Sequence, residues 1–397
     1  MKNLLTCYFF LFSSVFAMAQ LNLEGINSDA LNKLMDGATG SHTDAMVLYR
    51  GETMVGAWYF GKDRVQQDAL GITMPLAGLA IGILMDQGKI KSLETPVSTW
   101  YPEWKEGDKA AIKLRHLLAH TSGLGTHSVN DLAPDASENF IEFALKTDLK
   151  APPGSLHKLN PRAVNLLSGI VAKVAGEPLD SFLNKHLFSK MGITEVSWTK
   201  DKAGNVLVMT GLKIFPEDLA AIGVMCLQRG KWKEQQLISA GWFEKAFAPA
   251  SDTAENGAHL WWRIYGQTVY VIDRKLLDQY REAGVNAQFI EGMSRLQGRY
   301  NGRTALIAVF KGALGERWQD SISKYLSGTD MQVARREYQD LLGYNANGRY
   351  GQWLVLYPES QLVGVRMIAE TSVENMKRDN FNNFGDLMRR LISKPKE

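Results

Sequence analysis

The hydrophobic pattern predicts two β-hairpins, one near each end of the chain. Residues 45–49 and 54–60 are apolar runs separated by a polar turn, and residues 353–357 and 362–368 form a second such pair. The second turn begins with Pro358, whose fixed φ suits the start of a β-turn. Strands at both ends with helical material between them indicate an α+β fold, with one antiparallel sheet built from both chain ends.

Between the hairpins the apolar positions follow a helical period. Residues 75–87 are apolar on nearly every side, begin with Pro75 and stop before Gly88, which predicts a buried helix. Further helices are predicted at 114–119, 162–175, 179–187, 216–228 and 241–247, and a last one at about 373–392. We therefore expect a mostly helical lobe over about 90–250, inserted into the sheet and flanking it.

The segment from about 264 to 343 has a different pattern. It combines a short β run at 268–272 with helical stretches such as 331–342, which Thr329 or Asp330 would cap and Gly343 would end. Basic and acidic side chains are nearly balanced in it, so its charge indicates no particular partner. We treat it as an elaboration of unassigned role.

Composition excludes several classes of protein. The chain has 397 residues, 45% of them hydrophobic, with a formal net charge of +3. Intrinsic disorder needs low hydrophobicity and high net charge, and this chain has neither. It also carries no basic stripe or tract, so we expect no nucleic-acid partner.

The first 19 residues have the pattern of a secretory signal peptide. Lys2 precedes an apolar run at 4–16, and residues 17–19 (Ala-Met-Ala) form a small-x-small cleavage site. The run is shorter than the roughly 20 residues that span a bilayer, so we expect an exported, periplasmic or secreted protein with no membrane span after cleavage. Cleavage removes Cys7 and leaves Cys226, which lies in an apolar helical run and is expected to be a buried thiol.

Several segments, taken in order, resemble the serine β-lactamase and penicillin-binding protein superfamily. They are residues 79–90, 112–124 (IKLRHLLAHTSGL), 153–154, 165–169, 191–193, 210–212 and 348–352. The resemblance is to the class C-like branch, with D-alanyl-D-alanine carboxypeptidases and related esterases, and it spans about 45–367. It implies one β-lactamase-related domain over 20–397, with an antiparallel sheet flanked by helices.

The resemblance also implies where catalytic motifs would lie. In the superfamily a Ser-x-x-Lys motif supplies the nucleophile and the lysine that activates it, because residues i and i+3 share one face of a helix. Here the motif falls on Gly71 and Met74, which have neither a hydroxyl nor an amine. The Tyr-x-Asn motif falls on Leu159 and Pro161, and the Lys-Thr-Gly motif begins at Ala346. All three positions lack the acylation chemistry.

Other residues are candidates for the remaining cleft by their places beside these motifs. They are Thr73, Asn160, Trp261, Trp262, Asn347, Gly348 and Gln352. Thr73 lies two residues before Pro75 and is expected to cap the helix. His116 and His120 are four residues apart but have no third ligand at a suitable spacing, so we expect hydrogen bonding, with no metal and no cofactor.

Three functional hypotheses follow. The first is an exported, non-catalytic member of the superfamily that binds a peptidoglycan-like peptide, a small amide or ester, or a protein. The second is an active serine hydrolase (an esterase, an amidase or a β-lactamase-like enzyme) with a relocated nucleophile, either Thr73 or Ser321, which forms Ser-x-x-Lys with Lys324. The third makes the segment 264–343 a protein-interaction module.

Overall fold

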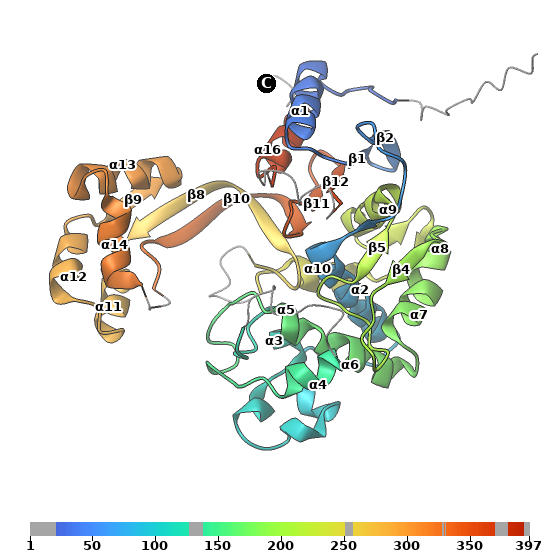
Figure 1. The fold of residues 1–397 in the computed structure, drawn as a ribbon, viewed down its shortest axis with the longest axis horizontal. Helices are drawn as coiled ribbons and strands as arrows, with labels where there is room; N and C mark the ends of the chain where they lie inside the picture. Colours follow the sequence, from blue (N-terminus) through green and yellow to red (C-terminus); the bar gives the residue numbers. More distant parts are fainter. Residues whose placement is uncertain are drawn as a thin grey trace, which may run out of the picture.

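The computed structural model describes residues 21–126, 138–250, 257–327, 329, 331–369 and 380–392. Figure 1 shows a large body and a long two-stranded arm that carries a smaller group of helices at its far end. The predicted leader, and part of the predicted helix at 373–392, lie outside the described residues. Within the described ranges, no helix has both the length and the apolar character needed to cross a membrane.

The main sheet is built from both chain ends, as predicted. Its order is β2-β1-β12-β11-β10-β8-β9, and β1 pairs antiparallel with β12. The bounds of the two terminal hairpins are β1 (Ala45–Arg50), β2 (Thr53–Trp58), β11 (Trp353–Tyr357) and β12 (Leu362–Met367). The α+β class and the antiparallel sheet of the prediction are confirmed.

The side chains of β1 point alternately into two separate cores of the body. Ala45 and Val47 belong to the large core shared with the helical lobe, whereas Met46 and Leu48 face a second core. Helices α1 (Ser28–Gly40) and α16 (Phe384–Arg389) cover the second core and lie together in Figure 1. Helix α9 (Pro216–Leu227) packs on the opposite face, against β1, β11 and β12.

The helical lobe surrounds α2 (Thr73–Asp86), whose residues from Thr73 to Leu84 are all buried, as predicted. The predicted helix at 162–175 is divided into α5 (Pro161–Val164) and α6 (Leu166–Ala175), and α7 (Leu179–Leu183) continues as a π-helical turn to Phe188. The other helices of the lobe are α3 (Leu114–Leu118), α4 (Phe140–Leu145), α8 (Ser189–Met191) and α10 (Ala240–Phe247).

Smaller elements complete the body. A three-stranded sheet has the order β3-β5-β4, and β6 pairs with β7 in a short hairpin. Their bounds are β3 (Gln67–Asp68), β4 (Val196–Trp198), β5 (Leu212–Ile214), β6 (Lys231–Trp232) and β7 (Gln235–Gln236). Strand β3 leads directly into a 3-10 turn at Leu70–Ile72, which places the start of α2.

Thr73 is not the N-cap of α2, so that prediction was wrong. The chain is already helical at Thr73 because the 3-10 turn precedes it, and the N-cap position belongs to Ile72. The Thr73 hydroxyl is fully buried and accepts a hydrogen bond from the backbone N–H of Leu212 at 3.2 Å. It therefore ties α2 to β5.

The arm consists of β8 (Trp262–Ile272) and β10 (Arg335–Asn347). They pair antiparallel from Trp262 opposite Asn345 to Val271 opposite Arg335. The predicted helix at 331–342 is therefore wrong, and the β run at 268–272 is only the end of a longer strand. Residues 331–342 have apolar positions at a helix-like spacing, but pairing with β8 overrides this local preference.

The tip of the arm carries a satellite, which we define as residues 273–334. It contains α11 (Arg274–Glu282), α12 (Ala287–Ser294), β9 (Gly298–Asn301), α13 (Gly302–Leu314) and α14 (Trp318–Leu326). Its buried apolar side chains, among them Tyr280, Met293 and Phe310, form a cluster separate from both cores of the body. The satellite therefore has a small core of its own.

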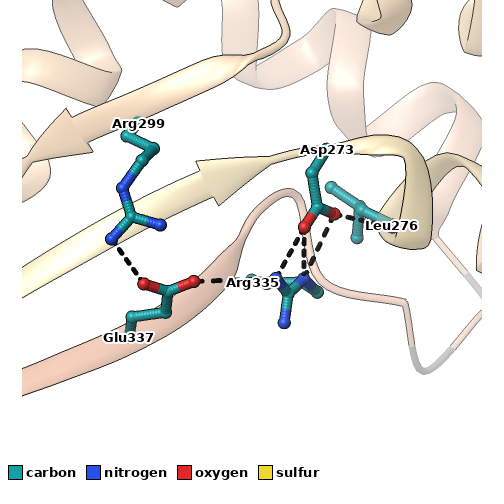
Figure 2. A network of polar contacts seen from close by, with 5 residues as sticks. All are labelled: Asp273, Leu276, Arg299, Arg335 and Glu337. Carbon is teal, nitrogen blue, oxygen red and sulfur yellow. Dashed lines mark hydrogen bonds and ion pairs between the residues drawn. The ribbon is translucent and has the colours of Figure 1, made fainter.

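A chain of ion pairs joins the satellite to the arm (Figure 2). Arg335 contacts both carboxylate oxygens of Asp273, with its Nη2 2.6 Å from Oδ2. Arg299 on β9 pairs with Glu337 on β10, across the intervening strand β8. Asp273 is also the N-cap of α11, since its Oδ1 accepts the backbone N–H of Leu276 at 3.0 Å. The network fixes the direction in which α11 leaves the arm.

Candidate functional site

Gly71, the predicted nucleophile position, lies against the end of β10. A Cβ atom placed on Gly71 would be 2.3 Å from the backbone carbonyl oxygen of Asn347 and 3.4 Å from the Cα of Gly348. Real Cβ atoms do not approach a carbonyl oxygen so closely, and backbone cannot swing aside as a flexible side chain does. The position accommodates glycine only, as long as β10 stays where it is.

The end of β10 is held firmly in this place. Asn347 pairs with Trp353 on β11, and the backbone N–H of Gly348 donates to the carbonyl of Gln352 at 2.9 Å. The Gln352 side chain is fully buried; its Oε1 accepts from the N–H of Tyr350, and its Nε2 donates to the carbonyl of Ile368 at 2.9 Å. Gln352, predicted as a cleft residue, therefore braces the turn after β10.

Arg366, on β12, supports the same turn. Its guanidinium is fully buried and donates to the carbonyls of Gly351 at 2.7 Å and Tyr350 at 3.1 Å. It also donates to the carbonyl of Ser41 at 2.7 Å and to the hydroxyl of Thr43 at 2.9 Å. Sequence reasoning missed this residue, although an arginine inside the apolar run 362–368 was a usable signal.

The second motif position, at Leu159 and Pro161, also lacks a catalytic side chain. Leu159 is 43% exposed, and Pro161 is the first residue of α5, where a missing N–H is tolerated. Asn160 between them caps α5: its Oδ1 accepts the N–H of Ala163 at 3.1 Å and its Nδ2 donates to the carbonyl of Leu124 at 2.9 Å. Met74 and Ala346 are both buried.

The two tryptophans separate into different roles. Trp261 is buried in the large core, with its ring edge-on to Phe247 at 5.5 Å. Trp262 begins β8, is half-buried and stands edge-on to the ring of His157 at 5.7 Å. Trp261 therefore packs in the core, and of the two tryptophans only Trp262 is partly accessible.

The alternative nucleophile Ser321 lies far from the other candidates. Ser321 and Lys324 are on α14 in the satellite, at the opposite end of the arm from Trp261 and Asn347 (Figure 1). A strand rises about 3.3 Å per residue, so β8 alone separates its two ends by roughly 33 Å. The Ser321 version of a relocated nucleophile is therefore excluded.

A pocket of about 270 Å³ lies on the side of Asn160 that faces the 120–126 segment. Its polar lining comes from His120, Ser122, Thr126, Lys150, Lys158 and Asn160. Only Asn160 among them was a predicted cleft residue. The lysines carry no motif that sequence reasoning could have used, because the pocket assembles from three separate segments.

The two histidines of the 112–124 segment are held neutral. His120 is 5% exposed, and burial lowers its pKa to about 3, with the nearby His157 adding to the effect. Burial also lowers the pKa of His116 to about 4, assisted by Arg115. Each Nδ1 accepts a backbone N–H, from Lys113 for His116 and from Asn160 for His120, so the predicted hydrogen bonding is confirmed.

The described residues offer neither a metal site nor a reactive thiol. Among the described residues, no group of three His, Cys, Asp or Glu side chains is placed to hold a metal ion. Cys226 is fully buried in the large core, and burial raises the pKa of its thiol. It has the packing role that the sequence predicted.

An acidic cluster at the start of α9 was not anticipated from the sequence. Glu217 accepts hydrogen bonds from the hydroxyl of Tyr59 and from Nε of Arg64, the latter at 2.9 Å. Burial and the adjacent Glu217 raise the pKa of Asp218 to about 6. These contacts fasten residues 59–64 to α9.

Comparison with known proteins identifies the family. The family model described as Beta-lactamase matches residues 39–384. The chain belongs to this family of serine β-lactamase-related proteins, as the sequence motifs had indicated. The resemblance stated from the motifs is therefore confirmed.

Individual relatives are distant. PbpX of Bacillus subtilis (strain 168), whose name assigns it to the penicillin-binding proteins, is 29% identical over 39% of this chain and 41% of its own length. The esterase EstB of Burkholderia gladioli is 28% identical over 31% of this chain and 36% of its own length. The matches thus span well under two thirds of these curated relatives.

Solved structures share the fold. A penicillin-binding protein from Bacillus halodurans superposes with a TM-score of 0.53 and 14% identity, covering 84% of this chain and 94% of that one. The relatives of this chain thus include one named as a penicillin-binding protein and one named as an esterase. What this chain does depends on its own site.

Proposed function

We propose that the chain is an exported member of the β-lactamase family that forms no acyl-enzyme and binds its ligand without hydrolysing it. The observation that carries the proposal is the 2.3 Å approach of the Asn347 carbonyl oxygen to the Cβ position of Gly71. A nucleophilic serine at Gly71 would need this occupied space. The obstacle is therefore the backbone of β10 itself, in addition to the missing hydroxyl.

The other motif positions support the same proposal. Met74 cannot accept a proton, Leu159 has no hydroxyl to relay one, and Ala346 supplies no cation at the end of β10. Removing the nucleophile, its activator and the relay together leaves only binding and dipole effects. The ligand class that we propose is a peptidoglycan-like peptide or a small amide or ester.

A covalent-labelling experiment tests the proposal. The purified chain is incubated with a fluorescent penicillin and, separately, with a fluorophosphonate probe, and both samples are denatured before electrophoresis. We expect no label to survive denaturation in either sample. Stoichiometric labelling would overturn the proposal and favour an active serine hydrolase with a relocated nucleophile, which peptide mapping would then locate.

A variant with restored motif residues sharpens the result. Gly71→Ser, Met74→Lys and Leu159→Tyr together return the nucleophile, its activator and the proton relay. We expect this variant to remain unlabelled and to be less stable than the natural chain, because the new side chain at position 71 collides with β10. Efficient labelling of the variant would mean that β10 moves aside easily, and the natural chain would then lack acylation only because its catalytic groups are missing.

A second candidate function is protein binding through the segment 264–343. The observation that favours it is the separate core of the satellite, held away from the body on a two-stranded arm. Because Val271 pairs with Arg335, replacing residues 272–334 by Asn-Gly would close the arm as a tight hairpin. A partner cross-linked by the full chain and equally by this shortened variant would exclude the satellite as the binding surface.

A further inference from the structure

A second pocket lies where β10 separates from β11 to become part of the arm. The pairing of the two strands stops at Tyr344 opposite Leu356, whereas β10 stays paired with β8 on its other side. The pocket at this fork, which we call the fork pocket, has a volume of about 250 Å³. Its lining comes from β10, from the ends of α9 and α10, and from β11 and the turn after it.

An irregularity in β10 shapes the fork pocket. The register against β8 shifts between Leu341 and Gly343, so Leu342 is an extra residue in the strand. Asp340, two residues earlier, has φ of 57°, a left-handed conformation that is unusual outside glycine. A Cβ on Gly343 would lie 2.1 Å from the carbonyl oxygen of Leu356, so the two backbones approach closely there. Bulges and left-handed residues of this kind are common beside functional sites.

Most of the lining is apolar. Leu227, Phe247 and Leu356 border the pocket and belong to the large core. The ring of Tyr344 stacks on that of Phe247 with the centroids 3.9 Å apart, which gives the pocket a flat aromatic side. Leu341 also borders it, although 42% of this residue is exposed. An apolar group that fills the pocket would therefore remove apolar surface of both the core and Leu341 from water.

One positive and one negative side chain complete the lining. Arg229 follows the end of α9, Glu359 lies in the turn between β11 and β12, and both are exposed. Within the part of the chain that the structure describes, neither forms an ion pair, either with the other or with a third residue. A guanidinium binds a carboxylate through two parallel hydrogen bonds, and a carboxylate accepts from an ammonium. The lining therefore complements a ligand that carries both charges.

We propose that the fork pocket binds a free amino acid with an apolar side chain, such as leucine. Its carboxylate would contact Arg229, its ammonium Glu359, and its side chain the apolar lining. The volume of about 250 Å³ is below the roughly 300–1,000 Å³ of pockets for drug-sized ligands, which favours a ligand of amino-acid size. Gly71 and residues 346–348 are outside the lining, so the inference goes beyond the proposed function and does not depend on whether the chain acylates.

Calorimetric titration of the full chain with leucine tests the site, and two analogues of nearly the same shape each remove one charge. Isocaproate lacks the ammonium, and isoamylamine lacks the carboxylate. We expect saturable binding of leucine and at least tenfold weaker binding of each analogue, because each loses one charge-assisted contact. Equal binding of either analogue, or no saturation by leucine at about 50 mM, would overturn the proposal.

Two further ligands test the size and the apolar character of the ligand. Glycine keeps both charges without an apolar side chain, and we expect it to bind at least tenfold more weakly than leucine. In glycyl-leucine the ammonium is one residue further from the carboxylate. Tighter binding of this dipeptide than of leucine would mean that the pocket holds the end of a peptide, and the assignment to a free amino acid would be wrong.

An arginine variant locates the carboxylate. Arg229 and Lys233 are both exposed and both have φ of 52°, a conformation that asparagine adopts readily. Arg229→Asn should weaken leucine binding at least tenfold and leave the weak binding of isoamylamine unchanged, since that analogue has no carboxylate. Lys233→Asn is the matched control, because Lys233 is outside the lining. If it weakened leucine binding as much as Arg229→Asn, the site would be elsewhere.

A glutamate variant locates the ammonium in the same way. Glu359→Gln should weaken leucine binding at least tenfold and leave isocaproate binding unchanged. Glu52→Gln is its control, because Glu52 is an exposed residue in the corresponding turn between β1 and β2 and is outside the lining. Equal weakening of leucine and isocaproate by Glu359→Gln would show that Glu359 does not contact the ammonium, contrary to the proposal.

A leucine variant tests the apolar contact. Leu341→Ala should weaken the binding of leucine at least threefold, because Leu341 would be covered by the ligand side chain. Leu314→Ala is the control, since Leu314 is 37% exposed on α13 of the satellite and is outside the lining. Equal effects of the two would overturn the placement of the ligand. Labelling by penicillin is measured on the same samples, so a failure of this proposal and a failure of the non-acylating proposal give different results.

Discussion

Arg366 and Arg335 show how differently the body and the satellite are held together. Arg366 is fully buried beneath the turn after β10, where it donates to the carbonyls of Ser41, Tyr350 and Gly351. Arg335 stands at the junction of arm and satellite, with 29% of its side chain exposed, and pairs with the partly exposed Asp273. One arginine satisfies buried backbone, and the other forms an ion pair in contact with water.

The difference predicts where stability resides. A buried carbonyl that loses its donor keeps the full cost of desolvation, whereas an exposed ion pair is replaced readily by water and salt. The same turn that Arg366 holds also fixes Asn347 against Gly71. Closure of the nucleophile position therefore rests on a turn held by buried hydrogen bonds.

The largest effect is expected for Arg366→Met. It leaves several buried carbonyls without a donor, at about 1–3 kcal/mol each, so we expect a loss of about 3–5 kcal/mol in the free energy of unfolding. Arg335→Met, the same substitution in the satellite, should cost about 1 kcal/mol or less. Urea denaturation of both variants makes the comparison, and equal losses would contradict it.

The second largest effect is expected for Gly71→Ala. The new methyl group would displace the Asn347 carbonyl, and we expect about 2–3 kcal/mol of destabilisation from overpacking. Gly78→Ala, in α2 just after the 3-10 turn that holds Gly71, is the control, because a Cβ there lies 3.6 Å from Leu260, an ordinary contact. It should be neutral or stabilising by up to about 1 kcal/mol through helix propensity.

Gly71→Ala and Gly78→Ala are compared by the midpoint of urea denaturation and by hydrogen exchange of the β10 amides. Faster exchange near Asn347 in Gly71→Ala, but not in Gly78→Ala, would place the strain at the closed position. Similar midpoints for the two variants would show that β10 yields without cost, and the argument for a permanently closed site would fail.

A smaller effect is expected from pH. The pKa of His120 is about 3 in the folded chain, below the roughly 6.5 of an unfolded histidine, so only the unfolded chain gains a proton as pH falls through 6.5. Stability is complete above about pH 7 and is lost toward pH 3, by about 1.4 kcal/mol for this residue at pH 5.5.

The variant His120→Asn should remove that part of the loss between pH 7.5 and pH 5.5. His42→Asn is the control, since His42 has the same positive φ of 54° but is exposed. Unfolding free energies at the two pH values decide the matter. An undiminished pH dependence in His120→Asn would mean that, in the natural chain, the His120 ring takes up a proton without unfolding.

The sequence predicted the body well because its elements are dense in apolar residues. Both terminal hairpins and α2 were recognised from that density alone, and the motif alignment found the missing catalytic groups at Gly71 and Met74. The alignment did not reveal that the Asn347 carbonyl occupies the nucleophile's space. Close backbone approach depends on tertiary packing, of which a glycine in sequence gives only a hint.

The arm and the pocket were harder to predict for a related reason. Strand β10 pairs with a partner about seventy residues earlier, and a two-stranded arm exposed on both faces lacks the alternation that marks a strand. The pocket joins His120 to Lys150 and Lys158 through hydrogen bonds between loops. No local pattern carries that information.

The smallest effect is expected for Asp273→Asn in the network of Figure 2. Asparagine still caps α11, because its side-chain oxygen can keep accepting the N–H of Leu276, but it loses the ion pair with Arg335. Arg335 holds the pKa of Asp273 below its usual range, so the pair stabilises the fold above about pH 4 and this contribution is lost in acid. We expect less than about 1 kcal/mol at neutral pH, because the pair is partly exposed.

Hydrogen exchange should show this loss in α11 alone, with the amides of α2 and β12 unaffected. Added salt at 1 M should reduce the difference between Asp273→Asn and the natural chain, since screening weakens the pair that the substitution removes. If the amides of the body exchanged faster as well, the satellite would be coupled to the body's global unfolding. In that case the arm transmits stability, and the two regions would form one cooperative unit despite their separate cores.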